Sequence, residues 1–253
     1  MHLAKLLIAT ALVAAPAGLT AAPAPLANVT VSVASTSRDP DNAKLDEGRK
    51  PAELLRFFGL RKGMNVLDMF GVNRYWSELI APAVGPAGKV VVYEPTQFYK
   101  GDSVAKFNAF AAKHPNVSIR VSPFESPDLP KNFADFALIN LDYHDTYWQS
   151  DKYGIPRMDP DAFLKRLYAS VKHGGIVGVV DHAANPSGDT RAVVDKLHRI
   201  DPAVVKRDFK KAGFVLVGSS DMYRNPADDH SLLVFDPKIR GKTDRFVLKF
   251  KKR

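Results

Sequence analysis

Short apolar runs alternate with amphipathic stretches along most of the chain, a pattern typical of a parallel sheet covered by helices on both faces. Seven runs predict strands, at residues 65–70, 89–93, 117–121, 135–141, 176–181, 214–220 and 245–251. Helices are predicted at residues 52–58, 75–83, 103–113, 159–171 and 202–212. An irregular stretch joins the last two strands, so we expect them to form an antiparallel pair at one edge. The pattern predicts an α/β, doubly wound, seven-stranded sheet that is mostly parallel.

The composition fits one globular domain of substantial size. The chain has 253 residues, of which 45% are hydrophobic and 25% are charged. Two independent domains would be cramped in this length. We therefore predict a single domain over residues 38–253, preceded by a linker at residues 23–37 that is rich in Ala, Pro, Ser, Thr and Val.

The N-terminus has the features of a bacterial secretory signal. One early cation, Lys5, precedes an apolar run from Leu6 to Ala15 that is too short to span a bilayer as a mature helix, and small residues follow. We predict a signal peptide over residues 1–22 and export to the periplasm, with cleavage between about Ala17 and Ala27. The alternative is an uncleaved membrane anchor. The absence of cysteine fits export and excludes both disulfides and a thiolate zinc site.

The chain is basic, and much of the excess charge lies near the C-terminus. The formal net charge is +9 at pH 7. The C-terminal cations are Lys238, Arg240, Lys242, Arg245, Lys249, Lys251, Lys252 and Arg253. They indicate a solvated strand face or a weak contact with an anionic envelope surface. No nucleic-acid-binding motif accompanies them, so we expect no nucleic-acid partner. The sequence does not indicate an oligomeric state.

The sequence of residues 65–79 predicts a buried strand, a tight turn and the start of a helix. An acidic residue, Glu94, closes the second predicted strand, where a nucleotide-binding α/β fold holds a ribose. This arrangement predicts a pocket for an adenosine-like ligand. The turn contains only one glycine, Gly71, where such a turn usually has two or three.

Several blocks of sequence carry a resemblance to a known family. They are residues 38–51, residues 65–81, Tyr143-His144-Asp145, and residues 178–182, 197–202, 224–229 and 235–246. With these blocks and the order of its elements, the chain resembles a Rossmann-like class I S-adenosylmethionine-dependent methyltransferase. It resembles more closely the predicted exported methyltransferases of Gram-negative bacteria. The resemblance covers nearly all of the predicted mature chain.

The resemblance implies S-adenosylmethionine as cofactor and methyl transfer to an oxygen or nitrogen of a small-molecule or envelope substrate. It implies that the turn after the first strand lies along the methionine part, that Glu94 binds the ribose and that residues after the third strand flank the adenine. The implied cofactor-binding residues are Asp68, Phe70, Gly71, Asn73, Tyr75, Glu94, Phe124, Glu125 and Asn140. The chain departs from the family at Val72, Asn73 and Arg74, where glycines are usual, and these side chains fill space that a bare backbone would leave to the ligand.

Residues with titratable side chains follow or end the fourth and fifth predicted strands. Adjacent parallel strands bring such ends close together. One reading is general base catalysis by His144 or His182, oriented by a neighbouring carboxylate. The candidate catalytic residues are Tyr143, His144, Asp145 and His182.

Two alternatives remain for these strand ends. A divalent metal could be held by Asp142, Asp181 and His182, by positional similarity to metal-dependent catechol-type methyltransferases. Asp181 and His182 could equally cap a helix and bond to the backbone. His198, Arg199 and Asp201 precede a predicted helix and are read as structural, with Asp201 as its N-cap.

A second class of function also fits the sequence: an exported, non-catalytic ligand-binding protein that keeps the fold with an altered loop. Motifs of phosphate-binding loops, of serine hydrolases and of zinc proteases are absent from the sequence, so it gives no support to nucleotide hydrolysis or to those hydrolytic activities.

Overall fold

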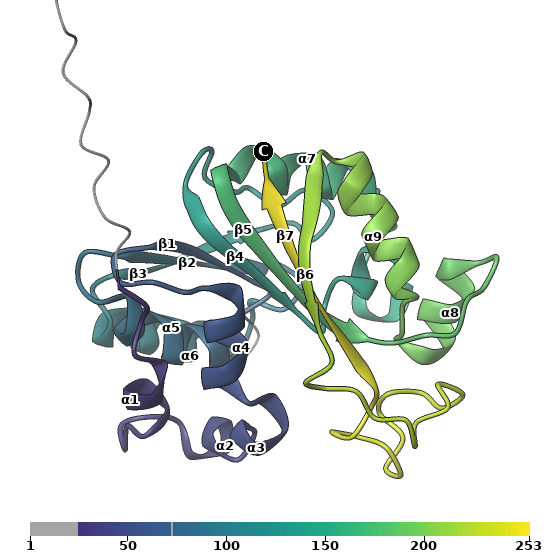
Figure 1. The fold of residues 1–253 in the computed structure, drawn as a ribbon, viewed down its shortest axis with the longest axis horizontal. Helices are drawn as coiled ribbons and strands as arrows, with labels where there is room; N and C mark the ends of the chain where they lie inside the picture. The colour runs from purple at the N-terminus through teal and green to yellow at the C-terminus, as the bar shows by residue number, and fades with distance from the viewer. Residues whose placement is uncertain (1–24, 72) are drawn as a thin grey trace, which may run out of the picture.

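A seven-stranded sheet with strand order β3-β2-β1-β4-β5-β7-β6 forms the centre of the computed structural model (Figure 1). The structure describes residues 25–71 and 73–253, so the predicted signal peptide and Val72 lie outside the described residues. The strands are β1 (Asn65–Met69), β2 (Lys89–Pro95), β3 (Val117–Ser122), β4 (Ala134–Asn140), β5 (Val171–His182), β6 (Phe214–Ser220) and β7 (Arg245–Lys252). The first five are parallel, and β7 runs antiparallel between β5 and β6. The predicted fold class is confirmed.

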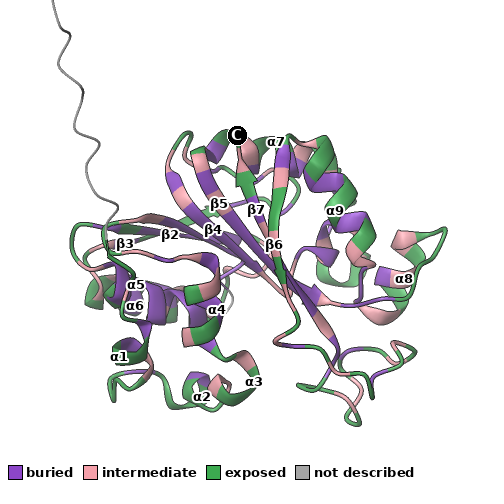
Figure 2. Cartoon of the chain, viewed as in Figure 1, coloured by how far each residue is buried: buried purple, intermediate pink, exposed green. Residues whose placement is uncertain are grey.

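Helices cover both faces of the sheet. On one face, α4 (Pro51–Phe58), α5 (Tyr75–Val84) and α6 (Asp102–Lys113) bury a cluster that includes Leu55, Leu79 and Phe107. On the other, α7 (Pro160–Ser170) and α9 (Pro202–Lys211) bury Phe163 and Phe209. The strands of the middle of the sheet are buried between these two layers (Figure 2). This is the two-sided burial that near-continuous apolar strands require.

One helix of eight residues was not predicted. Residues Thr190–Leu197 form α8, which is capped by the Asp189 side chain on the Ala192 N–H at 3.1 Å. Val194 is its one fully buried residue, so the sequence carries too little apolar periodicity to indicate a helix there. The predicted N-cap of α9 is confirmed, because Asp201 accepts the N–H of Ala203 at 2.7 Å.

The described part of the predicted linker is attached to the domain. Residues Val29–Val33 form the short helix α1, which contacts α4 and α5, and Val29 is buried. The N–H of Ala27 donates to the Leu60 carbonyl at 3.0 Å. Residues 25–37 therefore pack against the folded body, in contrast to the free connection that their composition indicates.

Two further short helices, α2 (Pro40–Ala43) and α3 (Asp46–Arg49), lie beside the turn that follows β1. Buried Arg38 makes a two-pronged ion pair with Asp46, at 2.6 and 2.9 Å. The Asn42 amide donates to the Asn73 carbonyl at 3.0 Å. The segment that precedes β1 thus contacts the turn after β1 and stabilises it.

Part of the basic C-terminus ties β7 to its neighbours. The Lys249 ammonium donates to the Phe57 carbonyl at 2.9 Å, and the Lys252 ammonium donates to the Val171 carbonyl at 2.8 Å. These contacts favour the strand-face reading of these two cations. Among residues 25–71 and 73–253, no helix is long and apolar enough to cross a bilayer.

Candidate functional site

The carboxyl ends of β1 and β2 place Asp68 and Glu94 on the α5 side of the sheet. Asp68 accepts the hydroxyl of Ser77 from the first turn of α5, which fixes that helix to the strand. Burial raises the pKa of Asp68 to about 6, against the opposing effect of the hydrogen bonds from Ser77. Asp68 is therefore a positioning residue at the base of the turn.

Glu94 is a deeply buried carboxyl group at this edge of the sheet. The residue is 1% exposed, and its Oε2 atom is buried without a hydrogen-bond partner. Burial and the nearby Asp68 raise the pKa of Glu94 to about 8, although the Arg74 cation opposes them. A buried polar atom without a partner is rare in folded proteins, so this oxygen is a candidate acceptor for a hydrogen bond from a ligand.

The turn after β1 has backbone conformations that are usual for glycine. Phe70 and Arg74 both have left-handed backbones, with φ of 59° and 60°. Gly71 is required, because a Cβ there would lie 2.1 Å from Cγ1 of Val92. The backbone thus keeps the tight turn although side chains replace glycines. The Asn73 side chain supports it by accepting the N–H of Tyr75 at 3.3 Å.

Aromatic packing fills one side of this turn. The Phe70 ring lies 5.7 Å from that of Phe124 and 6.0 Å from that of Phe163, between ring centroids. Phe70 and Phe124 are buried, whereas Glu125 is exposed and accepts from the Gln97 amide at 3.3 Å. The two positions that the resemblance assigns to the adenine thus differ, since one is a core residue and the other lies on the surface.

Arg74 lies along the outer side of the turn. Its guanidinium is 3.9 Å from the Asp39 carboxylate and 5.5 Å from the centre of the Phe107 ring. It remains close enough to Glu94 to favour that carboxylate. Arg74 therefore combines an anchor to the N-terminal segment with positive charge near the acidic edge.

Tyr75 connects the start of α5 to α3. Its ring is buried, and its hydroxyl donates to Asp46 at 2.7 Å. The Arg49 guanidinium lies 4.3 Å above the ring. Burial lowers the pKa of Arg49, although Tyr75 and Asp142 favour its charge. Asn140, predicted to face the cofactor, ends β4 and is partly buried.

The ends of β4 and β5 are joined by a buried ion pair between His144 and Asp181. Asp181 accepts from the backbone N–H and the Nδ1 atom of His144, both at 2.8 Å, and from the N–H of His182 at 2.7 Å. Burial alone would lower the pKa of His144, but Asp181 and Asp145 outweigh it and raise the pKa to about 9. Burial likewise opposes charge on Asp181, yet His144 keeps its pKa below the usual value. Asp181 thereby also binds the first residue of the 3₁₀ helix η1 (His144–Tyr147).

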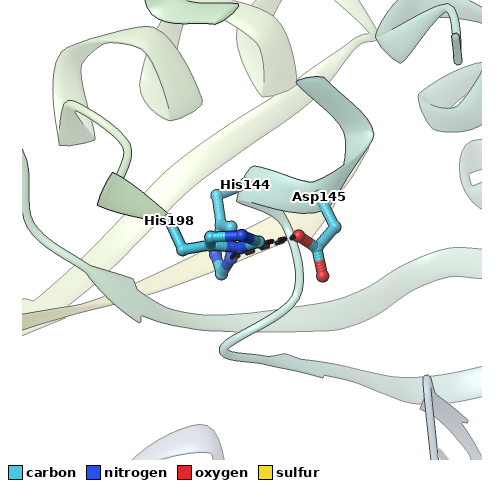
Figure 3. Close-up of side chains that lie close together, drawn as sticks. All are labelled: His144, Asp145 and His198. Atoms are coloured by element: carbon cyan, nitrogen blue, oxygen red, sulfur yellow. Dashed lines mark hydrogen bonds and ion pairs between the residues drawn. The ribbon is translucent and has the colours of Figure 1, made fainter. Parts of the chain in front are cut away.

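A second histidine completes this group. His198 follows α8 with a left-handed backbone, and its Nδ1 atom lies 3.3 Å from Nε2 of His144. Oδ1 of Asp145 is 3.2 Å from His144 Nε2 and 3.5 Å from His198 Nδ1. Figure 3 shows both rings directed toward that carboxylate. Trp148 and Phe235 pack against the His198 ring, with centroid distances of 4.9 and 5.2 Å.

Other candidate residues lie elsewhere. Tyr143 packs in the core, with its ring 5.4 Å from that of Phe209 and its hydroxyl donating to Asp208 at 3.1 Å. It therefore faces α7 and α9, in the same core cluster as Phe70. His182 bonds through Nδ1 to the Thr243 hydroxyl at 2.7 Å, and burial lowers its pKa to about 3.

The structure does not gather the three residues proposed as metal ligands around one point. Within residues 25–71 and 73–253, the group of three or more side chains with metal-ligand spacing is His144, Asp145 and His198. The Asp181 carboxylate instead bonds to Nδ1 of His144. Burial, and then Asp145, raises the pKa of Asp142 well above its usual value.

The comparisons with known proteins rest on structure. No protein-family model and no curated protein matches the chain. A SAM-dependent methyltransferase from Aquifex aeolicus matches with a TM-score of 0.58 and 19% identity, over 85% of this chain and 94% of that one. Geranyl diphosphate methyltransferase in complex with SAM matches with a TM-score of 0.57 and 12% identity, over 90% and 96%.

The cyclase SpnF also matches, with a TM-score of 0.55 and 16% identity, over 86% of this chain and 84% of that one. At these identities the matches show a shared fold. The chain therefore has the Rossmann-like fold found in solved SAM-dependent methyltransferases. Function has to be argued from its own residues.

Proposed function

We propose that the protein binds S-adenosylmethionine over the carboxyl ends of β1 and β2 and transfers its methyl group to an oxygen or nitrogen of a small molecule. The observation that carries this proposal is the buried, unpartnered Oε2 atom of Glu94. In an open α/β sheet, ligands bind at the carboxyl ends of the strands, and an acidic residue there accepts ribose hydroxyls.

The surrounding residues fit such a ligand. Glu94 would accept the two ribose hydroxyls, and Asp68 would hold the turn in place through Ser77. The cations Arg49 and Arg74 lie beside the same edge and would attract the ligand's carboxylate. When bound, the sulfonium supplies an electrophilic methyl group, and the chain's part is to hold the acceptor in line with it.

The geometry argues against His144 as the general base. Nδ1 of His144 is bonded to Asp181, and its Nε2 faces Asp145 and His198. A base must have a free nitrogen within reach of the substrate proton. We therefore assign the transfer to alignment of the reactants, with the proton of the acceptor group passing to water.

A specific observation favours the second candidate, a non-catalytic binding protein. Phe70 packs against Phe124 on the side that would take the adenine, and this reduces the space for a purine. In this alternative the Glu94 edge would bind a different hydroxyl-bearing ligand.

Isothermal titration calorimetry with S-adenosylmethionine and S-adenosylhomocysteine tests the cofactor. We expect binding by the wild-type protein and at least tenfold weaker binding by Glu94→Gln, because a carboxyl that releases its proton on binding offers two acceptor oxygens to the ribose hydroxyls and the amide offers one. Glu53→Gln is the matched control, since Glu53 is an exposed residue of α4. No heat from either compound would refute the proposal. Binding without methyl transfer to any acceptor in a panel of small hydroxyl and amine compounds would favour the binding-protein alternative.

Export to the periplasm is part of the proposal. It is supported by the Lys5 cation, the following apolar run and the absence of cysteine. A small molecule is the proposed substrate, and contact of the exposed C-terminal cations with an anionic surface is proposed as a weak interaction only.

A further inference from the structure

Three atoms that could bind a metal ion, one each from His144, Asp145 and His198, form a nearly equilateral triangle. The separations are 3.2 Å from His144 Nε2 to Asp145 Oδ1, 3.3 Å from His144 Nε2 to His198 Nδ1, and 3.5 Å from His198 Nδ1 to Asp145 Oδ1. A tetrahedral ion with bonds of about 2.0–2.1 Å places its ligand atoms about 3.3–3.4 Å apart. Octahedral coordination at the same bond lengths would need about 2.9 Å. The triangle matches one face of a tetrahedron.

The hydrogen bonding of Asp145 is a second observation. Its Oδ1 atom is buried and has no hydrogen-bond partner, although two imidazole nitrogens face it. The contacts thus have the distances but not the directions of hydrogen bonds. A common ion between the three atoms would satisfy the oxygen, because each donor then directs its lone pair to the same point.

A third observation concerns the orientation of His144. Its Nδ1 atom is bonded at 2.8 Å to fully buried Asp181, which leaves Nε2 directed at the triangle. Metal-bound histidines commonly donate their other ring nitrogen to a carboxylate in this way, which fixes the ring and strengthens the ligand. The rings of His144 and His198 meet nearly at right angles, so both can direct a nitrogen inward (Figure 3).

We propose that His144 Nε2, Asp145 Oδ1 and His198 Nδ1 bind one divalent transition-metal ion of the Zn²⁺ type. Two imidazoles and one carboxylate suit Zn²⁺ better than Mg²⁺ or Ca²⁺, which prefer oxygen ligands alone. Three protein ligands leave a fourth position for a water molecule or a ligand atom. This site uses no residue of the Glu94 edge, so it stands or falls independently of the proposed cofactor.

Titration of the chelator-treated full chain with ZnCl₂ tests the site. We expect one Zn²⁺ per chain, a rise in melting temperature with Zn²⁺ and none with equal Mg²⁺, and strong visible absorption with Co²⁺, as tetrahedral coordination gives. Asp145→Asn and His198→Ala should weaken Zn²⁺ binding by more than about 100-fold, since loss of a ligand exceeds the 10–100-fold effect of losing a supporting residue. His173→Ala is the control, because His173 is exposed and remote from the group in the fold.

Each result decides for or against the proposal. Asp145→Asn preserves the shape of the side chain, so it remains informative if His198→Ala loses its packing against Trp148 and fails to fold. Absence of Zn²⁺ binding by the wild-type chain would overturn the proposal. So would unchanged affinity in Asp145→Asn, equal affinity for Mg²⁺, or a Co²⁺ spectrum of the weak octahedral kind.

Discussion

Replacing Glu94 by glutamine should stabilise the protein at neutral pH while weakening ligand binding. Burial raises the pKa of Glu94 from 4.5 to about 8, so the folded state binds a proton that the unfolded state releases. A carboxyl group with a raised folded-state pKa makes the protein less stable as pH rises from the unfolded to the folded value. The Glu94→Gln variant carries an amide that stays neutral at every pH, which would remove this penalty.

The size of the effect follows from the two pKa values. At about 1.4 kcal/mol per pH unit, keeping Glu94 protonated in the folded state while the unfolded chain ionises costs roughly 1 kcal/mol of stability at pH 5 and roughly 3 kcal/mol at pH 7. For a chain of this length, 1 kcal/mol corresponds to about 2–4 °C in melting temperature. The advantage of Glu94→Gln over wild type should therefore grow by about 4–8 °C between pH 5 and pH 7.

Differential scanning calorimetry of both proteins between pH 5 and pH 8, without ligand, is the assay. The exposed Glu53→Gln variant corrects for the lost charge, and its difference from wild type should stay nearly constant. A Glu94→Gln difference that does not change with pH would show that Glu94 ionises freely. In that case Glu94 would not be a buried carboxyl held ready for a ligand.

Three further predictions concern the turn, the core and the N-terminus. Gly71→Ala should destabilise the fold by about 1–3 kcal/mol in urea unfolding, because the new Cβ would overlap Val92, and a neutral result would contradict that close approach. Arg199→Met should cost about 3–5 kcal/mol by the same measurement, since it leaves buried Asp228 without its ion-pair partner at 2.9 Å; an unchanged midpoint would mean that the pair contributes little. Protein recovered from the periplasm should begin between about residues 18 and 28 by N-terminal sequencing, and an intact Met1 would refute cleavage.

Most of the fold could be predicted from the sequence, because the buried strands carry local apolar runs. Both predicted ends of β6 are correct, and β1 ends one residue earlier than predicted. β5 begins five residues earlier than predicted, since Lys172 to Gly175 continue the strand as an irregular extension that turn residues concealed. Pattern reasoning detects packed periodicity well and strand extensions poorly.

The site was only partly predictable. The strand pattern predicted Asp68 and Glu94 near the ends of β1 and β2 and His144 after β4, and the structure has them there, because parallel strands end on the same side of the sheet. The position of His198 depends on where α8 ends relative to η1, a long-range relation with no local signal. Tyr143 was placed with His144 because it is adjacent in sequence, yet its hydroxyl donates to Asp208 of α9, whereas His144 bonds to Asp181 of β5.

The position of β7 sets the order in which the sheet can be completed. Among the described strands, β6 pairs only with β7, which in turn pairs with β5. During synthesis, residues 214–220 therefore have no docking partner until residues 245–252 have left the ribosome, and the β5 edge stays open for the same interval. A chain interrupted before residue 245 would therefore keep an open, aggregation-prone sheet edge along β5.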